Sequence, residues 1–156
     1  MSAELREQVP SFVVTRIGSR RIALPSAGIA ELILSPQLHR FPHTTPLIVG
    51  VVLRRGRVLP VLDVALSLLG VPSTAAKFCL VIERHVANIP DRYAIPVEGE
   101  CELVTGVMSP PKDENGFAIG FLDIAGEPIE VLDLEKAIAH GLGVRSECVG
   151  AAEVSP

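Results

Sequence analysis

The chain has 156 residues, of which 48% are hydrophobic and 21% charged, and its formal net charge at pH 7 is −4. This composition predicts a globular protein with a buried core, and the lack of a strongly basic stretch argues against nucleic-acid or anionic-membrane binding. No apolar run approaches the roughly 20 residues of a spanning helix, and no basic and apolar leader opens the sequence. We therefore expect a cytoplasmic protein without membrane insertion.

The first half of the chain predicts two β-hairpins and a short helix. Residues 12–17 and 21–24 flank the turn sequence Gly18-Ser19-Arg20. Ser26 is a candidate cap for a short helical turn, and the proline-containing segment 36–46 is expected to be irregular. A second hairpin is predicted from 47–53 and 58–62, followed by a helix that begins after Asp63 and ends at 70–72.

The second half predicts further strands and a closing helix. Residues 78–83 form a largely apolar run that is typical of a buried strand, and 93–97 and 104–108 are further strand candidates. The segment 109–115 is expected to be a surface loop. A last hairpin is predicted from 118–123 and 128–132, and a helix from Asp133 to about His140. Residues 1–10 and 144–156 are expected to be flexible termini.

The second half of the chain also repeats the first. The segment RIALP at 21–25 returns as RYAIP at 92–96, and five residues of the second hairpin recur in register in the last hairpin: Gly50, Gly56, Val61, Leu62 and Asp63, which return as Gly120, Gly126, Val131, Leu132 and Asp133. The repeat predicts two similar subdomains, with a sequence boundary near residue 73. Each is too small to be very stable alone, so we expect a shared core. The short, closely spaced strands predict an all-β fold of small barrels.

The repeated aspartates allow two interpretations. Asp63 and Asp133 could form a carboxylate pair for acid–base chemistry if they shared a cleft. Each also follows a strand and precedes a helix, where its side chain can accept hydrogen bonds from free backbone N–H groups. We favour the second interpretation and predict that both are structural helix caps.

The histidines do not predict a metal site. His39 and His43 are four residues apart, the spacing of two zinc ligands on one helix face, but Pro42 would break that helix. No HExxH motif or cysteine pair accompanies them. His85 and His140 are isolated. We expect solvated histidines and no bound metal.

The three cysteines, Cys79, Cys101 and Cys148, have no paired spacing, which predicts reduced thiols. Cys79 lies in an apolar run and is expected to pack as a small hydrophobe. The sequence also lacks a nucleophile elbow, a phosphate loop and a dinucleotide fingerprint. We therefore expect no catalytic residue and no cofactor.

Three arginines surround Gly56 at the tip of the second hairpin. Arg54, Arg55 and Arg57 form a focused positive site in an acidic chain, suited to binding a carboxylate. The alternative is a solvated turn in which one arginine pairs internally with a glutamate. Strand alternation points neighbouring arginines to opposite faces, so we expect Arg55 to face inward or across a groove and Arg54 to face solvent.

Residues 50–64, with the sequence GVVLRRGRVLPVLDV, resemble the central motif of the CheW-like family, the adaptor domain of bacterial chemosensory arrays. Residues 12–24, 29–32 and 120–134 are similar to other conserved segments of that family. The resemblance covers 11–143, which we expect to be a single CheW-like domain.

The resemblance implies a fold and a function. The fold would be two packed, five-stranded, SH3-like β-barrels with short helices. The protein would be a non-catalytic adaptor that couples the cytoplasmic tip of a methyl-accepting chemoreceptor to the regulatory domain of a CheA-type histidine kinase. It would be associated with membrane receptor arrays only through these partners.

The receptor tip would lie in a groove between the two barrels. Carried onto matching positions, the receptor-binding candidates are Ile29, Glu31, Gly50, Val51, Arg55, Gly56, Val97 and Glu98. An apolar groove with one arginine would suit an amphipathic helix. Leu53 and Arg54 stand where the family has Asn-Leu, and Glu98 and Glu100 alter its second-lobe strand.

Two other functions are compatible with the residues. The altered arginine-rich tip would also suit an array-independent protein- or peptide-binding module on the same fold. An enzyme using Asp63, Asp133 or the histidines has only the presence of these polar groups in its favour.

Overall fold

The computed structural model describes residues 9–34, 36–40, 45–73, 77–86, 89–99, 101–112 and 116–143, with only the backbone described at 85–86 and 89–90. Apart from Val9 and Pro10, the predicted flexible termini lie outside the described residues. In chain order the elements are β1 (Ser11–Ile17), β2 (Arg20–Pro25), the 3-10 turn η1 (Ser26–Gly28), β3 (Ile29–Leu34), β4 (Ile48–Arg54), β5 (Arg57–Leu62), α2 (Val64–Leu69), β6 (Phe78–Val86), β7 (Ile89–Val97), β8 (Glu102–Thr105), β9 (Ala118–Ile124), β10 (Glu127–Leu132) and α3 (Leu134–Gly141).

The three predicted hairpins are confirmed as β1–β2, β4–β5 and β9–β10, and the two predicted helices as α2 and α3. The prediction that Ser26 caps a helical turn is wrong. Ser26 lies inside η1, whose cap is Pro25 with no side-chain hydrogen bond. The segment that follows is strand β3, which was not predicted. No described helix is long and apolar enough to cross a membrane.

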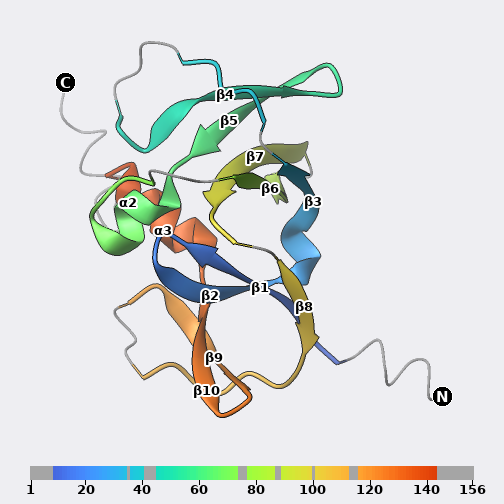
Figure 1. The fold of residues 1–156 in the computed structure, drawn as a ribbon, viewed down its shortest axis with the longest axis vertical. Coiled ribbons are helices and arrows are strands. Elements are labelled where there is room, and N and C mark those ends of the chain that lie inside the picture. Colours follow the sequence, from blue (N-terminus) through green and yellow to red (C-terminus); the bar gives the residue numbers. More distant parts are fainter. Residues whose placement is uncertain are drawn as a thin grey trace.

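The strands form two five-stranded sheets, which we call the first and the second lobe (Figure 1). The first lobe has the order β8-β1-β2-β10-β9 and the second the order β3-β6-β7-β5-β4. Helices α2 and α3 pack against each other at the junction of the lobes. The predicted all-β architecture is confirmed.

Each lobe contains strands from both halves of the sequence. The hairpin β1–β2 opens the first half, yet it pairs with β8 and β10 of the second half. Likewise β6–β7 opens the second half and pairs with β3 and β5 of the first. The repeat boundary near residue 73 is therefore not a boundary in space.

Each sheet has a parallel pairing that joins a strand from one half of the sequence to a strand from the other half. Val131 of β10 pairs with Ala23 of β2, and its repeat partner Val61 of β5 pairs with Ala94 of β7. The same pairing is thus built twice, each time from one strand of each half. Because the chain crosses between lobes, neither half can complete a sheet alone.

A short bridge closes each sheet into a barrel. His39, after β3, exchanges two backbone hydrogen bonds of 2.8 and 2.9 Å with Val51 on β4. Ser109, after β8, does the same with Phe121 on β9. These bridges link the segment that follows one outermost strand of each sheet to the other outermost strand, and so cover part of its free edge.

The bridges explain why Gly50 and Gly120 recur in the sequence. A Cβ atom at Gly50 would lie 2.6 Å from the carbonyl oxygen of His39, and one at Gly120 would lie 2.5 Å from that of Ser109. Only glycine leaves room for the crossing backbone at these two positions.

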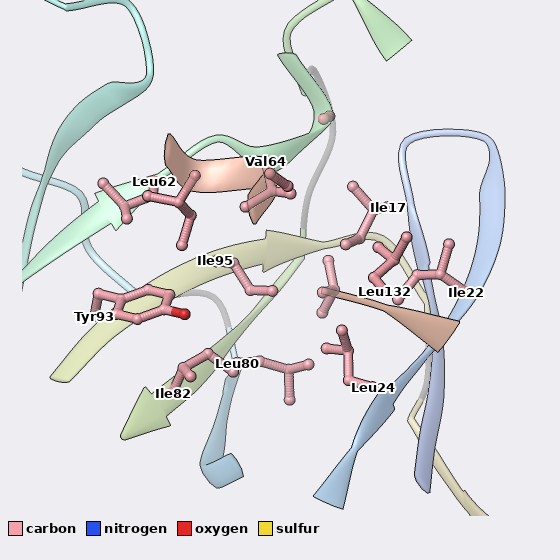
Figure 2. Close-up of a cluster of buried hydrophobic side chains, with 14 of the residues drawn as sticks. Ile17, Ile22, Leu24, Leu62, Val64, Leu80, Ile82, Tyr93, Ile95 and Leu132 are labelled. Carbon is pink, nitrogen blue, oxygen red and sulfur yellow. The ribbon is translucent and has the colours of Figure 1, made fainter. Parts of the chain in front are cut away.

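The apolar side chains form a central core between the lobes and a smaller core inside each barrel. Strand alternation divides them: in β7, Tyr93 and Ile95 face the central core, whereas Ala94 faces the barrel. Figure 2 shows Ile22, Leu24 and Leu132 of the first lobe meeting side chains of the second lobe in this central core. The lobes therefore share a core, as their size predicted.

The two repeated aspartates differ in what they bind. Asp133 accepts a hydrogen bond of 3.1 Å from the amide of Lys136, so its predicted role as the cap of α3 is confirmed. The prediction for Asp63 is wrong, because its side chain makes no hydrogen bond to α2. Its two carboxylate oxygens accept from the amide and the hydroxyl of Ser73, at 2.8 and 2.9 Å.

Candidate protein-binding groove

An apolar groove of about 410 Å³ lies between the lobes. It is lined by Leu24 and Leu132 of the first lobe and by Ile29, Ile82 and Tyr93 of the second. Most of these side chains belong to, or pack against, the central core, so the groove exposes the edge of that core. Exposed apolar concavities of this kind are typical of sites that bind other molecules.

One arginine at the groove joins the second lobe to helix α3. Arg84 of β6 donates to Asp91 at 3.1 Å and to Glu135 of α3 at 2.5 Å. Its guanidinium carbon lies 5.6 Å from the centroid of the Tyr93 ring, within the range of a cation–π contact. Glu83, which also lines the groove, pairs with Arg92 at 2.6 Å. The groove thus has an apolar floor and a charged rim.

Tyr93 lies in the floor with an unsatisfied hydroxyl. The residue is 3% exposed, and its hydroxyl oxygen has no hydrogen-bond partner among the described residues. Burial raises the pKa of Tyr93, and the nearby carboxylates of Glu135 and Asp91 raise it further, while Arg84 opposes them. Tyr93 therefore stays neutral well beyond the pH at which a free tyrosine ionises.

The arginine tip of the β4–β5 hairpin lies at the end of the second lobe (Figure 1). Arg54 donates to the carboxylate of Glu31 on β3, while the side chain of Arg55 is 75% exposed and approaches Glu31 only to 4.0 Å. The expected orientation is thus reversed, because Arg54 rather than Arg55 points across to β3, the outermost strand on the other edge of the sheet. Arg55 and Gly56 have φ values of 52° and 76°, so the two residues of the turn are both left-handed.

The eight residues predicted to contact a receptor fall into three groups. The five residues of the first group lie at the groove, at the hairpin tip or at the closing bridge. Ile29 lines the groove, and Glu31, further along β3, connects it to Arg55 and Gly56 at the hairpin tip. Val51 lies half-buried on β4, where its backbone forms the closing bridge with His39.

The second group, which consists of two buried residues, and the third, which is Glu98 alone, depart from the expected arrangement. Gly50 is buried at the closing bridge, and Val97 is fully buried in the central core, so the prediction that these two contact a partner is wrong for this structure. Glu98 lines a different cavity, beside Gly18 and α2, and its amide donates to the carbonyl of Arg16 at 2.9 Å. The structure does not bring Glu98 and Ile29 into one cavity.

The remaining polar candidates do not assemble into a site. Asp63 and Asp133 line separate cavities and share no cleft. The described residues contain no group of His, Cys, Asp and Glu side chains that could hold a metal ion. His39 is an exposed residue of the closing bridge, and His43 and the side chain of His85 lie outside the described residues. The ring of His140 lies 5.3 Å from that of Phe117.

Cys79 packs inside the second barrel, as predicted. Burial raises the pKa of its thiol to about 11, so the group is a poor nucleophile at neutral pH. Burial also raises the pKa of Cys101, and Cys148 lies outside the described residues.

Arg84 and Tyr93 were not predicted from the sequence as residues of the groove. A charged pair, Glu83-Arg84, directly follows the apolar run 78–82, and the repeat places Tyr93 where the first half has Ile22. A tyrosine hydroxyl in an otherwise apolar repeat position could have indicated a special site. The position of Arg84 beside α3 could not have been found, because it depends on how the lobes pack.

Sequence and fold both match one family of proteins. The profile of the CheW-like domain family matches residues 11–142. Protein FrzA of Myxococcus xanthus is 36% identical over 63 residues, a stretch that covers 40% of this chain and 39% of FrzA, well under half of that relative. The structure of the scaffolding protein TtCheW from Thermoanaerobacter tengcongensis matches with a TM-score of 0.67 at 17% identity, over 81% of this chain and 86% of that one. This likeness shows a shared fold.

Proposed function

Since the chain belongs to the CheW-like domain family, we propose that it is a cytoplasmic chemosensory adaptor that couples the tip of a methyl-accepting chemoreceptor to the regulatory domain of a CheA-type histidine kinase. The family consists of non-catalytic scaffolding adaptors. The observation that carries the proposal is the family match over nearly the whole chain, together with an open apolar groove between the two lobes.

The groove has the chemistry that a receptor helix requires. A chemoreceptor tip is a helical hairpin, and an amphipathic helix binds by placing its apolar stripe in a hydrophobic groove. Ile29 and Ile119, which are partly exposed, offer apolar surface for that stripe. Charges on the rim, of which Arg84 is central, would fix the helix in one register and orientation.

The hairpin tip extends this contact surface. Strand β3 begins with Ile29 at the groove, and its Glu31 pairs with Arg54 beside the exposed Arg55. A helix that left the groove along β3 would reach the guanidinium of Arg55, which is available for an acidic partner side chain. We therefore keep Ile29, Glu31, Val51, Arg55 and Gly56 as receptor contacts.

The proposal is tested by co-sedimentation of three purified components: this protein, its host's CheA-type kinase and a receptor cytoplasmic fragment, with kinase activity measured in the same tubes. We expect the protein to enter the pellet and to change the kinase activity. A protein that stayed in the supernatant with both partners would contradict the coupling function and favour the array-independent module.

A pair of variants makes the test specific to the groove. Ile29→Asp places a charge in the groove and should weaken receptor binding by at least about tenfold, since it removes apolar burial and adds desolvation. Leu103→Asp is the matched control, because Leu103 on β8 is 68% exposed and does not line the groove. Equal losses in the two variants would place the receptor elsewhere.

A further inference from the structure

The outward side of the β4–β5 hairpin is an exposed apolar surface at the end of the second lobe (Figure 1). Leu53 pairs directly with Val58 across the two strands, and Val51 pairs with Pro60. We call these four residues the hairpin face. Leu53 and Val58 are 62% and 60% exposed, and the other two are half-buried. The intervening Val52 points the opposite way, into the barrel core.

The equivalent side of the β9–β10 hairpin in the first lobe is partly charged. There Asp123 and Glu130 stand in the repeat positions of Leu53 and Pro60, at matching register. Asp123 accepts a hydrogen bond within its own turn, and Glu130 forms an ion pair with β2. The barrel therefore accepts charged side chains on this side of the hairpin, so its packing does not require the apolar face of the second lobe. Exposed apolar clusters that the fold does not require are typical of docking surfaces.

The tip beside the hairpin face carries a net positive charge. Arg54, Arg55 and Arg57 supply three guanidinium groups, and Glu31 supplies the carboxylate that faces them. Arg54 holds that carboxylate, which lies 4.0 Å from Arg55, and Arg57 forms no ion pair within the part of the chain that the structure describes. The tip would therefore attract acidic side chains of a partner.

The spacing of the hairpin face fits a helix. Val51 and Leu53 lie two residues apart on one strand, which is roughly 7 Å, and the cross-strand pairs are about 5 Å across. Side chains one turn apart on a helix are separated by about 5–6 Å. Two apolar side chains of one helix would thus cover the face, and the next turn of that helix would reach the arginine tip.

The hairpin face is too small to hold two copies of this chain together. A stable interface buries about 800 Å² on each partner and uses roughly 20 residues or more. Four residues cannot supply that area. Two copies that met through this face would also bring two net-positive tips into one interface.

We propose that the hairpin face docks an acidic amphipathic helix of a partner protein, with two apolar side chains over Leu53 and Val58 and carboxylates at Arg55 and Arg57. The hairpin face is separate from the groove between the lobes, and its use does not depend on the proposed adaptor function. Val51 and Arg55 are also proposed receptor contacts, so Leu53 and Val58 are the residues that distinguish the two surfaces.

NMR titration of the full chain with a synthetic helix of about 15 residues tests this proposal. The peptide carries two leucines one turn apart, flanked by glutamates, on an alanine background. We expect saturable shifts of backbone amides confined to 51–59. Leu53→Asn should weaken binding by about tenfold and Val58→Thr by about fivefold, because each removes apolar area from the contact. Both positions are exposed, so the fold should be retained.

Three controls locate the peptide. Leu103→Asn changes a similarly exposed leucine on β8, and Ile29→Asp changes the groove; both should leave the affinity for the peptide unchanged. A matched peptide with lysine in place of glutamate should bind at least about tenfold more weakly, because the tip is net positive.

Four results would overturn the proposal. The absence of saturable binding, or an unchanged affinity in the Leu53→Asn variant, would remove the docking site. An equal loss of affinity in the Ile29→Asp variant would place the peptide in the groove. Equal binding of the lysine peptide would exclude an acidic partner. Self-association that sedimentation velocity detects and Leu53→Asn abolishes would make a second copy the occupant.

Discussion

The carboxylate of Asp63 is bound by Ser73, ten residues further along the chain, rather than by the helix that Asp63 precedes. Its repeat partner Asp133 instead accepts from the amide of Lys136 in the first turn of α3. The same residue in the same repeat position thus caps a helix in one half and fixes a loop after a helix in the other.

This difference predicts unequal effects of removing the two carboxylates. Asp63→Ala should lower the free energy of unfolding by about 2–3 kcal/mol, because two hydrogen bonds to a buried carboxylate are lost. Asp133→Ala should cost about 1 kcal/mol, the usual value for an exposed cap. Urea denaturation of both variants measures this, and equal losses would contradict the difference in role.

The bridge that closes the second barrel predicts strong sensitivity at Gly50. Gly50→Ala should destabilise the protein by several kcal/mol, since the new methyl group would overlap the backbone of His39. Gly56→Ala is the matched control: its φ of 76° is unfavourable for alanine, but no atom lies within 4 Å of the new Cβ. It should cost only about 1 kcal/mol. Similar melting temperatures for the two variants would argue against a tight bridge.

Tyr93 predicts a loss of stability at alkaline pH. Because burial raises its pKa in the native state, the unfolded chain ionises first, above about pH 10. The contribution of neutral Tyr93 to the free energy of unfolding is therefore complete below about pH 10 and is lost as pH rises toward the native pKa. Since Tyr93 is the only tyrosine and the chain has no tryptophan, ultraviolet absorbance follows this one group.

Tyr93→Phe isolates the contribution of the hydroxyl. It should reduce the fall in stability above pH 10 and raise the free energy of unfolding at neutral pH by about 1 kcal/mol, because it removes a buried hydroxyl without a partner. A variant that is markedly less stable than the parent would show that the hydroxyl is hydrogen-bonded in solution.

The exposed arginine at the hairpin tip predicts a binding defect without a folding defect. Arg55→Glu should weaken receptor binding by about tenfold, through lost attraction and through repulsion with Glu31 nearby. Arg57→Glu makes the same charge change two residues away, and binding measured side by side should be affected less. Unchanged affinity in the Arg55 variant would remove Arg55 from the contact surface.

The strands and turns were largely predictable, because their signals are local. Alternation of apolar residues and turn glycines located the three hairpins, and each aspartate marked the start of a helix. Strand β3 was missed because Ile29, Leu32 and Ile33 have the spacing of a helix face. In the structure this segment is the last strand of its sheet, joined to β6 with a bulge.

The groove was predictable only in outline. The resemblance placed it between two barrels and gave Ile29, but it also gave Val97, which the central core buries completely. Which face of a strand meets a core depends on the register of its neighbours, and a shift of one residue exchanges the two faces.

The sequence by itself determined the strands, the turns, the repeat and the family, since periodicity, turn chemistry and motif are properties of short segments. Only the tertiary structure decided that each half of the repeat completes the sheet of the other. The reason is physical: a strand gains most of its stability from its hydrogen-bonding neighbours and the core it covers, and these come from distant parts of the chain. The tertiary structure therefore fixed the pairing of Val61 with Ala94 of the other half, rather than with Ala23 of its own half.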